Sequence, residues 1–213
     1  MSTEARRTVR SIALCCVFTL LSFAPAEAAL ADLFAGLDWI TLAPTNFDPT
    51  RSLYPNEASL REDLRVLCGF GFHGIFTYAS WQTVGQIPRL AREECFRGVV
   101  MGIWCVVEKG ACARDRVKAE FDNAVAAARY VDAYVVGNEG LDDPQRYNRA
   151  ELESYIARLK AATGKPVTTS EQFDDYIADP TLLALGDFVL PIVHPFWHDL
   201  RSPRTAAVWT ADQ

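Results

Sequence analysis

Several features that would indicate nucleic acid, a metal or a nucleotide as the partner are missing from this sequence. Basic residues form no cluster beyond the N-terminus, and the formal net charge is -6, so the chain offers no electrostatic footprint for nucleic acid. The cysteines form no CxxC motif, and this argues against a zinc site. We therefore expect no metal, no nucleic acid and a neutral or small partner.

The sequence also lacks a glycine-rich loop of the kind that binds phosphate. The first apolar run ends in "LAPTNFDPT", which contains no glycine. A dinucleotide-binding sheet usually carries such a loop directly after its first strand. We therefore expect no nucleotide, flavin or other cofactor.

The longest apolar run is short for a membrane span and lies near the N-terminus. Three arginines precede "SIALCCVFTLLSFA", and a small-x-small pattern follows at residues 26–28. This order is typical of a signal peptide. We predict a signal peptide over residues 1–28 and one exported domain over residues 29–213, secreted or periplasmic, with no stable membrane association after cleavage. An uncleaved membrane anchor is the alternative.

Four cysteines follow the predicted signal peptide: Cys68, Cys95, Cys105 and Cys112. An even number of cysteines in an exported chain favours one or two disulfides. Cys105 and Cys112 are close in sequence and flank a Lys-Gly turn, so they are the favoured pair. The sequence alone leaves the pairing open.

Short apolar runs alternate with amphipathic, charged stretches along the mature chain. We expect six strands, at residues 37–44, 74–80, 97–106, 131–139, 165–173 and 187–197. We expect helices at residues 56–69, 83–93, 115–130, 148–164 and 179–186, and a last helix that begins at Pro203 after Ser202. Asn56 is the expected cap of the first helix, with Gly69 just past its end.

Repeated alternation of strand and helix requires a parallel sheet. Two architectures compete, an open doubly wound sheet and a (β/α)8 TIM-type barrel. Polar and aromatic residues gather at the C-terminal ends of the expected strands, where a barrel builds its site. We favour an incomplete (β/α)8 barrel with about six βα units.

Side chains suited to a sugar follow most of these strands. They are Tyr78, Trp104, Asn138, Glu139, Glu171, His194 and Trp197. Aromatic rings stack on the C–H faces of a sugar, and amides and carboxylates pair with its hydroxyls. Each residue also has a structural interpretation, because a carboxylate can cap a helix and a tryptophan or histidine can lie in the core. Since the carboxyl ends of parallel strands share one edge, we expect one common site.

Three segments together resemble glycoside hydrolase family 17, the β-1,3-glucanase-type barrels. They are "SLREDLRVLCGFGFHGIFTYAS", "YVVGNEG" and "PVTTSEQFDDYIADPTLLALGDFVLPIVHPFW", and the resemblance covers roughly residues 37–210. It implies that Glu139 is the general acid/base and that Asn138 bonds a substrate hydroxyl beside the cleaved linkage. It also implies that Glu171, Tyr78 and His194 line the sugar site, and that the partner is a β-glucan oligo- or polysaccharide.

The resemblance further implies a retaining mechanism with two carboxylates about 5 Å apart. The attacking carboxylate should come from a seventh strand, in a Glu-Thr-Gly-Trp-like motif, and no such motif occurs in this sequence. We therefore expect a truncated member of the family. The alternatives are a catalytically inactive carbohydrate-binding fragment, a β-glucan transglycosylase, or an inverting scheme in which Glu171 is the base, about 6.5–9.5 Å from Glu139.

Overall fold

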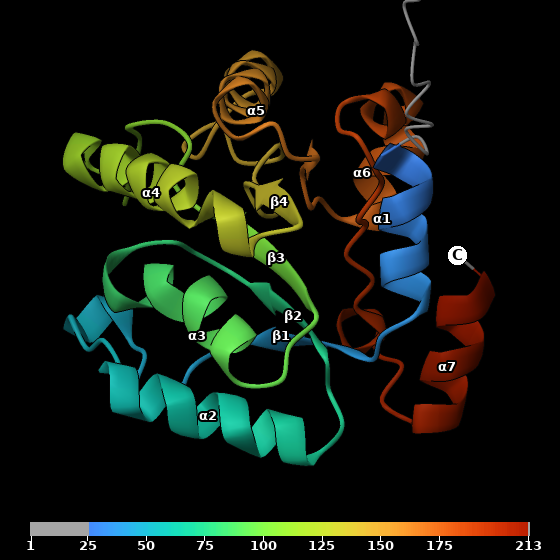
Figure 1. Cartoon of the computed structure of the whole chain (residues 1–213). Coiled ribbons are helices and arrows are strands. Elements are labelled where there is room, and N and C mark those ends of the chain that lie inside the picture. The colour runs from blue at the N-terminus through green and yellow to red at the C-terminus, as the bar shows by residue number, and fades with distance from the viewer. Residues whose placement is uncertain (1–25, 213) are drawn as a thin grey trace, which may run out of the picture.

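Five parallel strands form one sheet in a computed structural model that describes residues 26–212 (Figure 1). The strands are β1 (Trp39–Leu42), β2 (Gly74–Thr77), β3 (Gly98–Ile103), β4 (Ala133–Val136) and β5 (Val167–Thr168). Their order in the sheet is β1-β2-β3-β4-β5, so each strand pairs with its neighbour in sequence. The α/β fold with a parallel sheet is therefore confirmed.

Four of the helices connect successive strands and cover one face of the sheet. The helices are α1 (Ala26–Ala35), α2 (Glu57–Gly69), α3 (Ile87–Glu93), α4 (Arg114–Ala127), α5 (Arg149–Thr163), α6 (Phe173–Ala178) and α7 (Pro203–Asp212). Helices α2 to α5 lie on one side of the molecule, and α1, α6 and α7 lie on the other (Figure 1). Of the predicted signal peptide, residues 1–25 lie outside the described residues, and residues 26–28 are the start of α1.

Local sequence signals explain where the helices begin and end. Asn56 caps α2 by accepting a hydrogen bond from the Ser59 N–H at 2.9 Å, as predicted. Gly69 lies inside α2 rather than past its end, and the chain turns instead at Gly71, where φ is +90°. Helix α5 has a capping box at Asn148 and ends at Gly164 in a left-handed conformation, which confirms both predicted ends.

The expected sixth strand, residues 187–197, does not form. Within the described residues this segment makes only an isolated parallel bridge between Ile192 and Gln172, and a 3-10 turn follows at Pro195–His198. Pro191 and Pro195 have no N–H to donate to a strand ladder, which explains the failure of a run that is otherwise apolar. Strand β5 is likewise shorter than residues 165–173, since it ends at Thr168, and α6 begins at Phe173.

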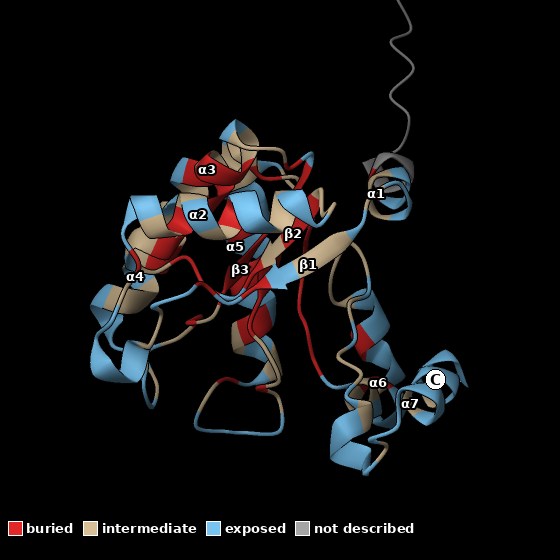
Figure 2. Cartoon of the chain, turned by 90° about the horizontal axis from the view of Figure 1, so that it is seen from below, coloured by how far each residue is buried: buried red, intermediate tan, exposed pale blue. Residues whose placement is uncertain are grey.

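The two faces of the sheet carry separate apolar clusters. On the helix-covered face, Leu60, Leu64, Ile75, Met101 and Leu152 are fully buried. On the opposite face, Val100, Ala133 and Val135 pack with Leu30 of α1 and with Phe34, Trp39, Phe76 and Phe188. Figure 2 shows the buried residues concentrated around the strands and α3, whereas α7 carries no buried residue.

Two disulfides join parts of the helix-covered layer. Cys105 and Cys112, the favoured pair, are bonded and close the loop between β3 and α4. Cys68 and Cys95 form the second bond, which ties the end of α2 to the segment before β3. The prediction of one or two disulfides is therefore confirmed.

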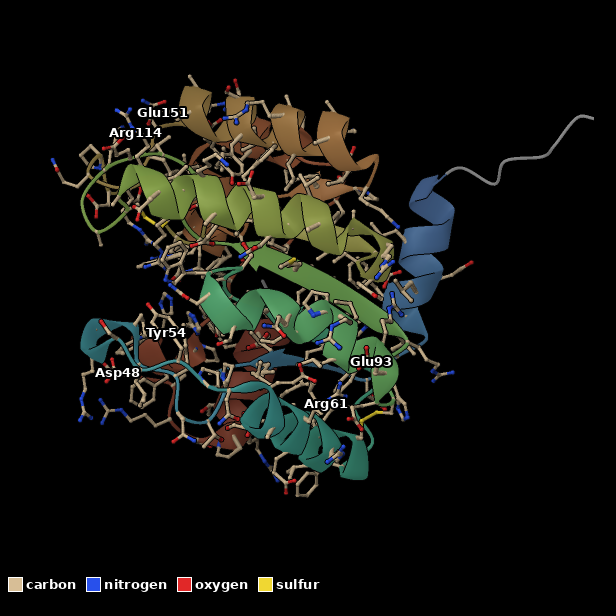
Figure 3. The ribbon with its side chains drawn as sticks, turned by 60° about the vertical axis from the view of Figure 1, so that its left-hand side comes forward. Asp48, Tyr54, Arg61, Glu93, Arg114 and Glu151 are labelled. Carbon is tan, nitrogen blue, oxygen red and sulfur yellow. A yellow bond between two sulfur atoms is a disulfide. The ribbon has the colours of Figure 1, made fainter. Side chains whose placement is uncertain are left out.

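Charged side chains link α2 and α3 on the outer surface. Arg61 pairs with Glu57, Glu93 and Glu94, and Figure 3 shows Arg61 and Glu93 side by side. Hydrogen bonds from Arg61 and Arg89 lower the pKa of Glu93. The network lies on the helix face away from the strands, so it contributes to helix packing rather than to the site. Within residues 26–212 no helix combines the length and the apolar character that a membrane crossing needs.

Candidate functional site

The turn after β4 departs from regular strand geometry at two of its residues. Gly137 has φ +75°, and Glu139 has φ +47°, a left-handed conformation that costs a non-glycine residue about 1 kcal/mol. The Gly137 N–H still donates to the Ile103 carbonyl, and the Glu139 N–H donates to the Ser170 carbonyl, both at 2.9 Å. The sheet therefore holds both sides of the turn. Backbone strain that is held in this way is common at functional sites.

The Glu139 carboxylate projects toward two polar neighbours. Its Oε1 lies 3.8 Å from Nε2 of His194, and its Oε2 accepts a hydrogen bond from the Asn138 amide at 3.4 Å. The Glu139 side chain is 27% exposed and that of His194 is 52% exposed. Arg146 donates to the Glu139 backbone carbonyl at 2.7 Å. Glu139 is thus half-buried, accessible, and fixed through both its backbone and its side chain.

Two cavities meet at Glu139 and His194. The first has a volume of about 320 Å³, and its lining includes Phe76, Tyr78, Asn138, Glu139, Ser170 and His194. The second has a volume of about 300 Å³ and is lined by Glu139, Gln172, Phe173, Ile192, His194, Trp197 and His198. Because Glu139, Ile192 and His194 line both, a ligand that filled both cavities would cross the Glu139 carboxylate.

The structure brings five of the seven predicted site residues together. Tyr78, Asn138, Glu139 and His194 line the first cavity, and Trp197 lines the second. Tyr78 and Trp197 are 54% and 75% exposed, so each has ring surface available for stacking. Tyr78, Asn138 and Glu139 follow β2 and β4 at one edge of the sheet, as expected, whereas His194 and Trp197 come from the segment after α6, where the expected strand does not form.

Trp104 lies elsewhere. It lines a separate cavity of about 230 Å³ beside the loop that the Cys105–Cys112 disulfide closes. The guanidinium groups of Arg116 and Arg146 stand 4.8 and 5.6 Å from the centre of its ring. Trp104 therefore packs with cations beside the site and does not line the two cavities that meet at Glu139.

Glu171 is completely buried and lines neither of the two cavities. Its Oε2 accepts hydrogen bonds from the N–H groups of Gly140 and Leu141, at 2.9 and 3.3 Å. Its Oε1 accepts from the hydroxyls of Tyr147 and Thr169, both at 2.9 Å. Glu171 is therefore a buried structural acceptor behind the Glu139 turn. This corrects the expectation that it binds substrate, and a carboxylate without solvent access cannot activate water in an inverting scheme.

The structural interpretations of Glu139 and His194 do not fit their surroundings. The helix after Glu139 is α5, whose cap is Asn148, so Glu139 caps no helix. His194 precedes the 3-10 turn at Pro195–His198 and makes no side-chain cap to it. Both side chains face the cavities instead.

Several site residues had not been expected. Ser170, Phe173 and His198 line the cavities, and Arg146 anchors the Glu139 backbone. Ser170 and Phe173 flank Glu171 in sequence, so the end of β5 was the signal that could have found them. Arg146 lies in a loop without any motif, and no local signal identifies it.

The chemistry of the site is that of a single carboxylate in an aromatic and polar cleft. Among the described residues that line the two cavities, Glu139 is the only carboxylate. A half-buried carboxyl group next to an amide and an imidazole can donate or accept a proton at a bound substrate. In residues 26–212 no group of three or more His, Cys, Asp or Glu side chains is placed to hold a metal ion. Compared with known proteins, the sequence matches no family model and no curated protein.

Proposed function

We propose that the two cavities bind a β-1,3-glucan-type oligosaccharide and that Glu139 is the acid/base of a retaining glycoside hydrolase. The observation that carries this proposal is the position of Glu139 at the junction of the two cavities, with Tyr78 on one side and Trp197 on the other. A saccharide stacked on both rings would place a glycosidic oxygen near the carboxyl group.

The order of the sheet supports the fold that this function implies. In a (β/α)8 barrel every strand pairs with its sequence neighbours, whereas a doubly wound sheet reverses its strand order and carries helices on both faces. Here the order is sequential, and α2 to α5 cover one face. We therefore propose an incomplete barrel whose site lies at the C-terminal ends of the strands. The two disulfides support an oxidising compartment, in line with the proposed export.

In the proposed reaction Glu139 protonates the leaving oxygen while a second carboxylate bonds to the anomeric carbon, and Glu139 later removes a proton from the water that displaces this carboxylate. Asn138, adjacent in sequence and within 3.4 Å of the carboxylate, donates to a sugar hydroxyl or to Glu139 itself. The imidazole of His194, whose Nε2 lies 3.8 Å from the other carboxylate oxygen, lines both cavities and can bond a sugar hydroxyl there. The attacking carboxylate of a retaining mechanism is not among the described residues that line the cavities.

That last observation favours a second candidate, a site that binds β-glucan without cleaving it. Stacking and hydrogen bonding need only the residues that the two cavities already contain. Calorimetric titration with laminari-oligosaccharides, followed by chromatography of the mixture, separates the candidates. Binding with shorter products supports the hydrolase, binding alone supports the second candidate, and neither one rejects both.

The first prediction concerns Glu139→Gln. We expect turnover of laminarin to fall by about 10²–10⁴-fold, because the amide cannot transfer the proton. Cleavage of a dinitrophenyl β-laminaribioside, whose leaving group needs no proton, should fall much less in the bond-breaking step. Glu62→Gln, an exposed change on α2, is the matched control and should leave both rates unaltered. Equal losses on the two substrates would reject the acid/base role.

A further inference from the structure

Glu171 is a buried carboxylate that the proposed chemistry does not use. Its two oxygens accept hydrogen bonds from four donors, two on the backbone and two on side chains. The backbone donors belong to Gly140 and Leu141, the residues that directly follow Glu139. One buried side chain therefore fixes the exit of the turn that carries the cavity carboxylate.

Tyr147 also packs against this turn. A Cβ atom added at Gly137 or Gly140 would lie 2.5 or 2.3 Å from the Tyr147 side chain, so both glycines press against its ring. The Tyr147 hydroxyl donates to Glu171, and burial together with the Glu171 charge raises its pKa, which keeps it a donor. The turn is thus held on both sides of Glu139, by the packing of Tyr147 against residue 137 and by the hydrogen bonds of residues 140 and 141 to Glu171.

We propose that Glu171 is the positioning residue of the site, which keeps Glu139 in its left-handed conformation with its carboxylate in the cleft. The proposal rests on the proposed function only for its catalytic consequence. Four donors meet a group that accepts and never donates, so the ionised carboxylate is the one side chain of this size that satisfies all of them. A glutamine amide in its place has one neutral oxygen, which accepts more weakly than a carboxylate oxygen, and its N–H₂ group can face the two hydroxyls only if their hydrogen bonds reverse.

Glu171→Gln is the second prediction and tests this directly. We expect the amide proton resonances of Gly140 and Leu141 to move upfield and their hydrogen exchange to accelerate by about tenfold as one hydrogen bond weakens. With laminarin we expect kcat to fall by about 100-fold while KM stays within about twofold, since misplacement of the acid affects the chemical step more than binding.

Glu120→Gln is the matched control, because Glu120 is equally buried and also accepts backbone N–H groups, from Ser80 and Trp104. It should lower the thermal midpoint without moving the Gly140 and Leu141 resonances. If Glu171→Gln does not fold, Thr169→Val removes one of the four donors and is measured in the same way. Unchanged resonances, or shifted resonances with unchanged kcat, would overturn the positioning role. A wild-type chain that neither binds nor cleaves laminarin rejects the proposed function. The amide resonances of Gly140 and Leu141 would still show whether Glu171 positions the turn.

Discussion

Buried and half-buried carboxylates in this protein differ in what stabilises them. Glu120 is fully buried, and desolvation raises its pKa, although Arg116 and the N–H groups of Ser80 and Trp104 favour its charged form. Asp175 of α6 is only partly buried but lies against the carboxyl group of Asp142. Burial, followed by the charge of Asp142, raises the pKa of Asp175 to about 6. The stability of a chain with such a carboxyl pair falls as the pH rises, whereas the contribution of an Arg–Glu pair is lost as the pH falls.

The third prediction is that Asp142→Asn flattens the pH dependence of stability. Because the folded-state pKa of Asp175 lies above its ordinary value of 3.8, the folded chain binds this proton more tightly. The stabilisation is complete below about pH 4 and is lost as the pH rises through about 6. Asparagine keeps a polar partner but removes the repulsion, so the variant should gain stability over the wild type mainly above pH 6.

Thermal midpoints at pH 4, 5, 6 and 7 measure this effect. Asp174→Asn is the control, since Asp174 is an exposed neighbour in the same first turn of α6. A difference between Asp142→Asn and wild type that does not grow between pH 4 and pH 7 would show that the two carboxyl groups are uncoupled.

At the scale of elements, the two disulfides constrain loops of different length. Cys68–Cys95 spans 27 residues and encloses β2 and α3, whereas Cys105–Cys112 spans 7 residues within one loop. Chain-entropy arguments give about 3.5 kcal/mol for the longer loop and about 2.5 kcal/mol for the shorter one. The shorter loop also borders the cavity beside Trp104.

The fourth prediction compares two double variants. Cys68→Ala/Cys95→Ala should lower the thermal midpoint by roughly 7–14 °C, at about 2–4 °C for each kcal/mol in a chain of this size. Cys105→Ala/Cys112→Ala should lower the thermal midpoint less. Binding of laminari-oligosaccharides should survive in this variant, because the loop between residues 105 and 112 lines neither of the two cavities at Glu139. A larger loss of stability for the second variant would contradict the loop-length argument. Each variant serves as the control for the other.

At the scale of the whole molecule, segments from the two ends of the described chain meet on the sheet face opposite α2 to α5. The Phe34 ring of α1 lies 5.4 Å from that of Phe188, and 5.1 Å from that of Trp39. Trp39 in turn lies 5.0 Å from Phe76 of β2. Among the described residues, an aromatic layer therefore covers the sheet face opposite α2 to α5, and no further strand lies there.

Sequence periodicity was a good guide where local rules decide the outcome. The capping box at Asn148, the left-handed Gly164 and the buried run of β3 are visible in short windows of sequence. The two prolines within residues 187–197 are a local signal against the sixth strand, whereas the burial of Glu171 was not predictable from a short window. Glu171 is buried because Tyr147 and Gly140 reach it from 24 and 31 residues away. The end of β4 was enough to predict where Glu139 lies. The contacts that Glu171 and Tyr147 make with its turn depend on the tertiary fold.

The fifth prediction tests the aromatic layer through two glycines. A methyl group at Gly74 would lie 2.2 Å from the Trp39 ring, whereas a methyl group at Gly69 has nothing within 4 Å. Gly74→Ala should therefore lower the free energy of unfolding by about 1–3 kcal/mol, because the ring must move within a packed layer. Gly69→Ala is the same chemical change inside α2 and should raise it by up to about 1 kcal/mol. Urea denaturation of both variants, of Trp39→Leu, and of Gly74→Ala combined with Trp39→Leu isolates the contact. If Gly74→Ala costs the same free energy of unfolding with leucine at position 39 as with tryptophan, then the Trp39 ring is not what fills the space beside Gly74. The aromatic layer would then be packed differently.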